Sequence, residues 1–319
     1  MKKKLEKFLL TLLILFSVFC FSSCVDKVVD DETALTAFLE SYAKIMQKDG
    51  YVMEGNFDFN FCIDEIDIAC DGTINAESTV SPNIASKVEM DVGLNVMGLK
   101  MTIPISYYAI FDKTANIYMC ALGEWTGESI EIEGNVFEKY LEIVKELRTK
   151  ESLLKLNNVM RKGCSAKFNG ITTINDISVY DIDIICNENL LAEMMNLLKD
   201  YPIYNIPLHK EPGQNGMEIS FDSISDEEVK EMSQILKDFS FKVYLKEKNC
   251  SFYGMEIDFK SFMDTIFANV STMLNEEVSA SSLELPDIEG NMQLFYLDKK
   301  PKTPITLPKE AIESVAAGL

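Results

Sequence analysis

The residue with the clearest chemical context in this chain is Cys24, whose thiol follows two serines close to the start of the sequence. Four lysines lie in the first seven residues, and a mainly apolar run then extends from Phe8 to Phe21. A basic start, a short apolar segment and small residues are the parts of a secretory signal peptide. The run is also shorter than the ~20 residues that a membrane-spanning helix needs. The order therefore predicts a secretory signal that ends in a cysteine.

The ending Ser22-Ser23-Cys24 resembles the lipobox of bacterial lipoproteins, in which a small residue precedes the cysteine. That resemblance implies a signal peptide over residues 1–23, cleavage before Cys24, and fatty acyl groups such as palmitate on its sulfur and then on its amino group. Each buried lipid methylene contributes about 0.8 kcal/mol, so two or three acyl chains hold a protein stably on a bilayer. The expected protein is extracytoplasmic and lipid-anchored, with a short acidic tether over 24–32.

Two other interpretations of this segment stay open, namely an ordinary cleaved signal with an incidental thiol and an uncleaved membrane anchor. The sequence also leaves open whether the membrane is the inner or the outer one.

The remaining residues that could support catalysis are scattered along the chain. His209 is the only histidine, and no spacing pairs it with a serine or cysteine nucleophile. The sequence has no G-x-S-x-G, no phosphate-binding loop and no cluster with metal-ligand spacing. Two distant carboxylates can meet in a fold, but nothing in the sequence nominates such a pair. We therefore expect a protein without catalytic residues, metal or cofactor.

Six cysteines remain in the exported part of the chain, and none of them forms a C-x-x-C pair. They are Cys62, Cys70, Cys120, Cys164, Cys186 and Cys250. An even number of thiols outside the cytoplasm is compatible with disulfides. Cys164 and Cys186 would face each other if a hairpin turned at Asn175-Asp176, whereas a turn at Asn169-Gly170 would separate them. This pair is the candidate disulfide, while Cys62 and Cys70 are predicted to point to opposite faces.

The composition limits the classes of partner. The formal net charge is −21, and removal of residues 1–23 leaves 26 basic against 50 acidic residues, a net charge of −24. A chain with this charge has no cationic footprint for nucleic acid, which is excluded as a partner. A mature chain of about 296 residues, with an apolar content of 47% in the whole sequence, can bury one large core or two moderate ones.

Hydrophobic periodicity defines the elements of the first half. Apolar residues at helical spacing after Asp30 predict a helix that ends at Gly50. From Phe57 the pattern alternates, and its phase changes at Asp64-Glu65, which predicts two antiparallel strands joined by a tight turn. Further strands are expected over about 84–97, 99–111 and 115–122, with breaks at Pro82, Gly98 and Asp112-Lys113. Pro104 should confine its strand to an edge or a bulge, and a second helix should follow Asn135.

The second half repeats a smaller unit of strand, hairpin, strand and helix. The segment Ser178–Ile184 is echoed by Ser251–Ile257, and an amphipathic pattern follows each of them. We expect one continuous body over 33–319, with two sub-halves at 33–160 and 161–319.

This layout resembles the LolA-like group of lipoprotein carriers and lipid-binding envelope lipoproteins. The residues that carry the resemblance are the lipobox, the single N-terminal helix, the run of long strands and the closing segment Leu307–Ala311, which reads Leu-Pro-Lys-Glu-Ala. The resemblance implies an α+β fold in which a curved antiparallel sheet forms a half-open barrel covered by helices. It also implies an apolar cavity between sheet and helices that shelters acyl chains.

Flexible methionines and a row of aromatic residues are the candidates for lining such a cavity. They are Met194, Met195, Met255, Met263, Phe57, Phe59, Phe61 and Trp125. The alternative for the methionines is ordinary core packing, and the alternative for Trp125 is a half-buried aromatic in a turn.

Two functional hypotheses follow. The first is a non-enzymatic envelope lipoprotein that binds a hydrophobic small molecule such as a lipid, in a cavity of several hundred cubic ångströms. The second is an envelope interaction or structural protein with a solidly packed core, no small-molecule ligand and an exposed apolar patch. The sequence does not identify a protein partner.

Overall fold

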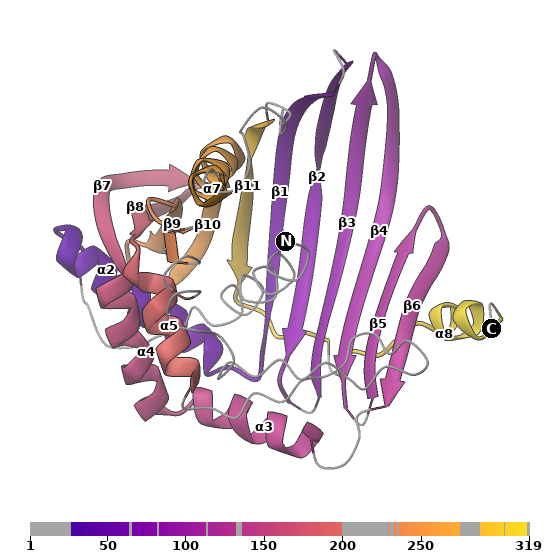
Figure 1. Cartoon of the computed structure of the whole chain (residues 1–319), viewed down its shortest axis with the longest axis horizontal. Helices are drawn as coiled ribbons and strands as arrows, with labels where there is room; N and C mark the ends of the chain where they lie inside the picture. Colours follow the sequence, from indigo (N-terminus) through magenta and orange to yellow (C-terminus); the bar gives the residue numbers. More distant parts are fainter. Residues whose placement is uncertain are drawn as a thin grey trace.

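Eleven strands form one open antiparallel sheet in the computed structural model of the chain. The structure describes residues 27–63, 66–81, 83–112, 114–131, 136–199, 229, 233–234, 236–274, 288–302 and 304–317. The strand order is β6-β5-β4-β3-β2-β1-β11-β10-β9-β8-β7, so β6 and β7 are the two edges (Figure 1). The α+β class and the large antiparallel sheet were expected, and the sheet is not closed into a barrel.

The first six strands follow one another as a meander. They are β1 (Gly50–Ile63), β2 (Ile66–Thr79), β3 (Ile84–Val96), β4 (Leu99–Phe111), β5 (Thr114–Ala121) and β6 (Glu124–Glu131). The first four strands contain 13 or 14 residues each, and apolar and polar residues alternate over most of β2 and β3. The bounds of β3, β4 and β5 agree with the predicted strands to within one residue, whereas β1 starts before the predicted alternation and β2 ends after it.

The second meander contains the last five strands. They are β7 (Cys164–Ile174), β8 (Ile177–Cys186), β9 (Ser240–Lys246), β10 (Phe252–Asp258) and β11 (Ile288–Leu297). The last strand, β11, lies between β10 and β1 and pairs with both, from Phe61↔Ile288 to Val52↔Leu297 on the β1 side. This pairing joins the two meanders into one sheet.

Six helices are described. They are α2 (Asp31–Met46), α3 (Val136–Leu147), α4 (Lys150–Gly163), α5 (Asn189–Lys199), α7 (Phe259–Leu274) and α8 (Lys309–Ala317). Asp30 caps α2 as predicted, since its side chain accepts a hydrogen bond from the Thr33 backbone amide at 2.8 Å. None of the helices in the described residues is long and apolar enough to cross a bilayer.

The two faces of the sheet differ in what covers them. We call the face that packs against α2 and α7 the inner face, as shown by the aromatic contacts Phe38–Phe241 and Phe59–Phe259. Most of the core lies on this face between the second meander and helices α2, α4 and α5. Val28 also belongs to this core with 2% of its surface exposed. The folded body therefore starts before residue 33, and the expected tether over 24–32 is too long.

The chain after β11 crosses the outer face of the first meander as an extended segment, described over residues 298–302 and 304–308, which we call the strap. Ile305 of the strap packs with Tyr108 and Ile110 of β4 and with Ala85 of β3. The Asn83 side-chain amide donates a hydrogen bond to the Ile305 carbonyl oxygen at 3.0 Å. The strap ends in α8, which lies beside β6 (Figure 1).

The structure resolves the two alternative turns of the β7–β8 hairpin. Asn175 and Asp176 form the turn with positive φ angles of 49° and 62°, the conformation of a tight two-residue hairpin. Gly170 instead lies at a bulge, where the register shifts after Phe168 and φ is 114°. Cys164 and Cys186 are consequently direct neighbours across the ladder.

Pro104 lies where β4 has a neighbour on one side only. It pairs with Asp91 of β3, whereas the pairing of β4 with β5 starts at Ile105. The position is an edge, as predicted, and the missing N–H of proline faces no strand.

Candidate functional site

A partly open apolar cavity of about 140 Å³ lies between α2 and the inner face of the sheet. Its walls come from α2 and α5, from β1, β8, β9, β10 and β11, and from residues just before β9. The lining residues are Phe38, Tyr42, Ile45, Tyr51, Met53, Cys186, Leu190, Leu236, Phe239, Phe241, Val243, Phe252, Met255, Ile257, Leu294 and Tyr296. The volume is smaller than the several hundred cubic ångströms that we expected and below the usual ~300–1,000 Å³ of small-molecule sites.

One wall of the cavity carries a polar group. The Lys48 ammonium donates a hydrogen bond to the Tyr296 hydroxyl oxygen at 2.5 Å and forms an ion pair with Asp298 at 3.2 Å. The hydrogen bond with Tyr296 raises the pKa of Lys48 above its ordinary value, against the opposing effect of burial. A positive charge is thus fixed next to one lining residue of an otherwise apolar cavity.

Beyond the cavity, the inner face of β1–β5 is a continuous apolar surface. The registers place Phe59 opposite Cys70, Cys70 opposite Leu94, and Leu94 opposite Met101, so these side chains share one face. Most inner-face side chains of these strands are half-buried. Every charged residue of β1–β5 lies on the outer face instead. These residues are Glu54, Asp58, Asp67, Asp71, Glu77, Lys87, Glu89, Asp91 and Lys100.

Four of the cavity candidates lie on this inner face or beside it. Met255 lines the cavity. Phe57 and Phe59 stack on each other with ring centroids 5.0 Å apart, and Phe59 also meets Phe259 of α7 edge to face at 5.2 Å. Phe61 lines a separate open groove of about 530 Å³ at the far end of β1 and β2. The structure thus places this row of aromatic residues on the same face as the cavity, but none of the three lies in the cavity wall.

The other candidates lie elsewhere. Met194 and Met195 of α5 are fully packed in the core, which agrees with the alternative interpretation of the methionines. Met263 is half-buried on α7 and does not line the cavity. Trp125 lies on the outer face, where its ring is 6.0 Å from that of Tyr108 near the strap. The expectation that Trp125 lines the cavity is wrong, because its register with Cys120 places it on the opposite face.

The two buried thiols Cys164 and Cys186 are not joined by a disulfide in the structure. Their hydrogen bond, followed by burial, raises the pKa of the Cys164 thiol well above its ordinary range. Cys62 and Cys70 lie on opposite faces, as predicted, since Cys70 is opposite Phe59 and Cys62 is opposite Asp67. Cys186 also lines the cavity, so the thiol pair lies at its wall.

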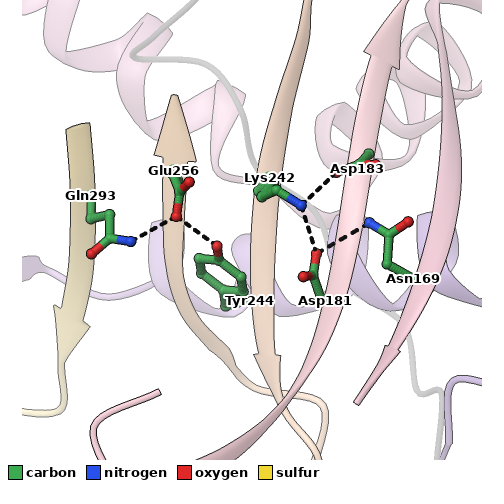
Figure 2. Close-up of polar contacts among 7 residues, drawn as sticks. All are labelled: Asn169, Asp181, Asp183, Lys242, Tyr244, Glu256 and Gln293. Carbon is green, nitrogen blue, oxygen red and sulfur yellow. Dashed lines mark hydrogen bonds and ion pairs between the residues drawn. The ribbon is translucent and has the colours of Figure 1, made fainter. Parts of the chain in front are cut away.

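A polar network crosses the outer face of the second meander (Figure 2). Tyr244 and Gln293 donate hydrogen bonds to the same carboxylate oxygen of Glu256, each at 2.7 Å. Lys242 bridges Asp181 and Asp183 at 3.4 and 3.3 Å. Burial, followed by the hydrogen bond to Glu256, raises the pKa of Tyr244 far above its ordinary value. The groups satisfy one another, so the network fits a structural role.

Two of the predicted residues lie outside the described part of the chain, namely Cys24 and His209. Among the described residues, no group of three or more histidine, cysteine or acidic side chains is arranged to hold a metal ion.

Several cavity residues were not predicted from the sequence, including Phe38, Tyr42 and Tyr296. Phe38 and Tyr42 lie on the apolar stripe of the predicted first helix. That stripe could have predicted that both side chains face the sheet.

No family model matches the chain, and no curated protein matches its sequence. The structure was also compared with solved structures. The Mycobacterium tuberculosis lipoprotein LppX aligns with 87% of this chain and 100% of its own, at 12% identity and a TM-score of 0.34. LprF from Mycobacterium bovis aligns with 89% and 100%, at 10% identity and a TM-score of 0.37. A DUF1329 family protein from Desulfovibrio piger gives 82% and 89%, at 6% identity and a TM-score of 0.18. The first of these is a lipoprotein by its own description.

Proposed function

We propose that the protein is a non-enzymatic envelope lipoprotein that binds the acyl chain of a lipid on the inner face of its sheet. The observation that carries this proposal is the segregation of charge in β1–β5, where every charged side chain lies on the outer face and the inner face stays half-exposed. A large apolar surface that is left accessible to solvent in a monomer usually marks a binding site. An acyl chain matches such a surface because it needs no hydrogen-bond partners.

The cavity would hold the end of such a chain. A cavity of about 140 Å³ is too small for a whole lipid, although a dry cavity of ~150 Å³ lined by apolar residues can hold a benzene-sized molecule. Leu294 connects the two regions, since it lines the cavity and lies beside Gly55 on the inner face of β1. The ligand would therefore extend from the cavity along the half-exposed inner face, in keeping with the half-open barrel that the LolA-like resemblance implies.

Acylation of Cys24 would keep this site at a membrane. Val28 is buried, so no more than four residues, Cys24 to Lys27, separate the lipid from the folded body. Such a segment spans at most ~14 Å when extended. Incorporation of radiolabelled palmitate in living cells tests the anchor, and Cys24→Ala should abolish the label and release the protein from membranes. An unchanged fractionation of Cys24→Ala would contradict this anchor.

The lipid proposal is tested on the mature chain with Cys24→Ser, purified from its native host, extracted with organic solvent and examined by mass spectrometry. A lipid present in about one copy per protein is the expected result. Extracts that stay empty, together with a protein that takes up no added fluorescent fatty acid or phospholipid, would contradict it. That outcome would favour the second hypothesis, an interaction or structural protein.

A further inference from the structure

Exposed apolar side chains concentrate at one end of the first meander, where β2 begins, β3 turns into β4 and β5 turns into β6. Of the ten large apolar side chains that are exposed in the described residues, six lie at this end. They are Ile66, Met97, Leu99, Met101, Met119 and Leu122, and together we call them the apolar tip. Met97 and Leu99 are the most exposed, at 80% and 79%. In Figure 1 the β3–β4 hairpin extends beyond the β5–β6 hairpin, so the tip forms a slanted margin.

The turns of both hairpins place an apolar residue in a backbone conformation that it adopts only at a cost. Met97 has a φ of 51° and Leu122 a φ of 53°, and each is followed by a glycine that also has positive φ. Asparagine or aspartate normally takes the first position of such a turn. The β7–β8 hairpin of the same protein follows that preference with Asn175-Asp176. Local stability therefore does not explain Met97 and Leu122, and exposure to water does not favour them either.

The β3–β4 part of the tip is also depleted of negative charge in a strongly acidic chain. Residues 92–111 contain a single charged residue, Lys100, and residues 114–123 contain none. Lys100 is exposed at the end of the β3–β4 hairpin between Leu99 and Met101. Two acidic side chains near the tip, Asp67 and Glu289, line the groove on its β1–β2 side. A third, Glu124, is exposed directly after the Leu122-Gly123 turn, so the β5–β6 end of the tip carries a negative charge. The β3–β4 part of the tip, which is apolar with one lysine, can approach an anionic surface that would repel the rest of the molecule.

The chemistry of the tip favours a lipid surface over a protein partner. Hot spots of protein interfaces are enriched in tryptophan, tyrosine and arginine, and the six tip residues include none of these. Addition of a partner strand would have to use the free edge of β4 beyond β5. Pro104 and Lys100 lie on that edge, and both residue types protect edges against strand pairing.

We propose that the apolar tip contacts the surface of a lipid bilayer, with Met97, Leu99 and Leu122 at the boundary between head groups and acyl chains. The backbone groups at the end of the β3–β4 hairpin are paired with each other, so shallow insertion of side chains leaves few of them without partners. The inner-face members Leu99, Met101 and Met119 continue directly into the apolar inner face. The tip would thus connect a bilayer to the inner face, the surface on which we propose that a lipid binds. The contact between tip and bilayer does not require a lipid on the inner face.

The test uses the mature chain with Cys24→Ser, which contains every described element, and flotation with vesicles of phosphatidylethanolamine and phosphatidylglycerol. The tip variant Met97→Asn/Leu122→Asn should reduce the vesicle-bound fraction about tenfold, the effect of losing two partly buried apolar side chains. The same variant should raise the thermal midpoint, since asparagine suits both turn positions. A rise in stability with a loss of binding cannot result from misfolding.

Ile171→Asn is the matched control, because Ile171 is a 53% exposed apolar residue on β7, far along the sheet from the tip. Its vesicle binding should equal that of the parent protein. In Leu99→Trp the added indole should be quenched by brominated lipids, beyond any quenching of Trp125 in the parent protein.

Three results would overturn the inference: no flotation of the parent protein, equal flotation of parent and tip variant, or a tip variant that abolishes only self-association in analytical ultracentrifugation. The last result would assign the tip to a second copy of the chain. Lipid in the organic extract together with failed flotation would overturn the bilayer contact alone. Flotation with empty extracts would leave the contact and remove the lipid site.

Discussion

The side chains of Cys164 on β7 and Cys186 on β8 face each other at a position of the ladder without mutual backbone hydrogen bonds. The next pair along the ladder is hydrogen-bonded, since the Asn187 backbone amide donates a hydrogen bond to the Gly163 carbonyl oxygen. Hydrogen-bonded and non-hydrogen-bonded pairs alternate in an antiparallel ladder, so the Cys164–Cys186 pair is of the second kind. At such positions the Cα atoms are about 4.5 Å apart, within the ~4.4–6.8 Å range of disulfides. Both thiols are buried, at 4% and 2% exposure.

We predict that this pair forms a disulfide on treatment with diamide, which accepts the two electrons and two protons of the thiols. The loop closed is roughly 20 residues long, so oxidation should stabilise the protein by about 3 kcal/mol. Peptide mapping by mass spectrometry identifies the bridge, and urea denaturation measures the gain. Before oxidation, iodoacetamide should label Cys120 much faster than Cys164, because burial and a raised pKa both suppress the thiolate. Equal labelling rates would contradict the packing of the pair.

A second prediction concerns the inner face of the sheet. Ile74 lies half-buried on the inner face of β2 opposite Gly55, whereas its neighbour Thr73 is exposed on the outer face. Ile74→Glu should lower the affinity for a fluorescent fatty acid by ten-fold or more, since a carboxylate next to an acyl chain must be desolvated. Thr73→Glu adds the same charge one residue away and should leave the affinity unchanged. Equal losses in both variants would show that net charge, and not the inner face, governs binding.

A third prediction concerns the pH dependence of stability. The pKa of Tyr244 is raised in the folded protein, so between its unfolded value near 10 and the folded value the folded state holds a proton that the unfolded state has lost. The contribution of Tyr244 is complete below about pH 10 and declines above it, by up to ~1.4 kcal/mol per pH unit. Urea denaturation from pH 8 to pH 11 should show a smaller decline in Tyr244→Phe than in the parent protein.

The same variant should also be less stable at neutral pH. Tyr244→Phe removes one of two hydrogen bonds to Glu256, and a bond to a charged group contributes about 1.5–3 kcal/mol. Parallel pH profiles of the two proteins would mean that Tyr244 ionises equally in the folded and unfolded states.

Much of the first meander could be predicted from the sequence because each strand has one polar and one apolar face. The breaks at Pro82, Gly98 and Asp112-Lys113 predicted the ends of β3 and β4 to within one residue, with Gly98 in the turn between them. The first half of β1 was missed because Val52 is apolar on the outer face, near the strap, which breaks the alternation. Helix α4 was missed although Thr149 caps it, because its buried residues, such as Leu153 and Leu156, lie within a largely polar sequence.

The cavity and the tip could not be predicted, for a physical reason. Alternation assigns residues to a face of the sheet, but it does not reveal the order of the strands in two meanders. The cavity wall formed by Tyr296 and Met53 exists only because β11 pairs with β1. Trp125 shows the same limit, since its face depends on pairing with Cys120. Met97 and Leu122 are simply apolar in the sequence, and their exposure depends on how far each hairpin extends.

The last prediction concerns the strap, which holds the outer face by a few buried side chains. Ile305 is 5% exposed and packs against Tyr108, in the cluster that includes Trp125. Ile305→Ala should destabilise the protein by about 2–5 kcal/mol, because the cavity it leaves lies between an extended segment and a rigid sheet. Trp125 fluorescence should shift to longer wavelength as water reaches the cluster. The control Ile312→Ala removes a half-exposed side chain of α8 and should change stability by less than ~0.5 kcal/mol. If both variants had equally small effects with unchanged fluorescence, the strap would contribute nothing to the stability of the sheet.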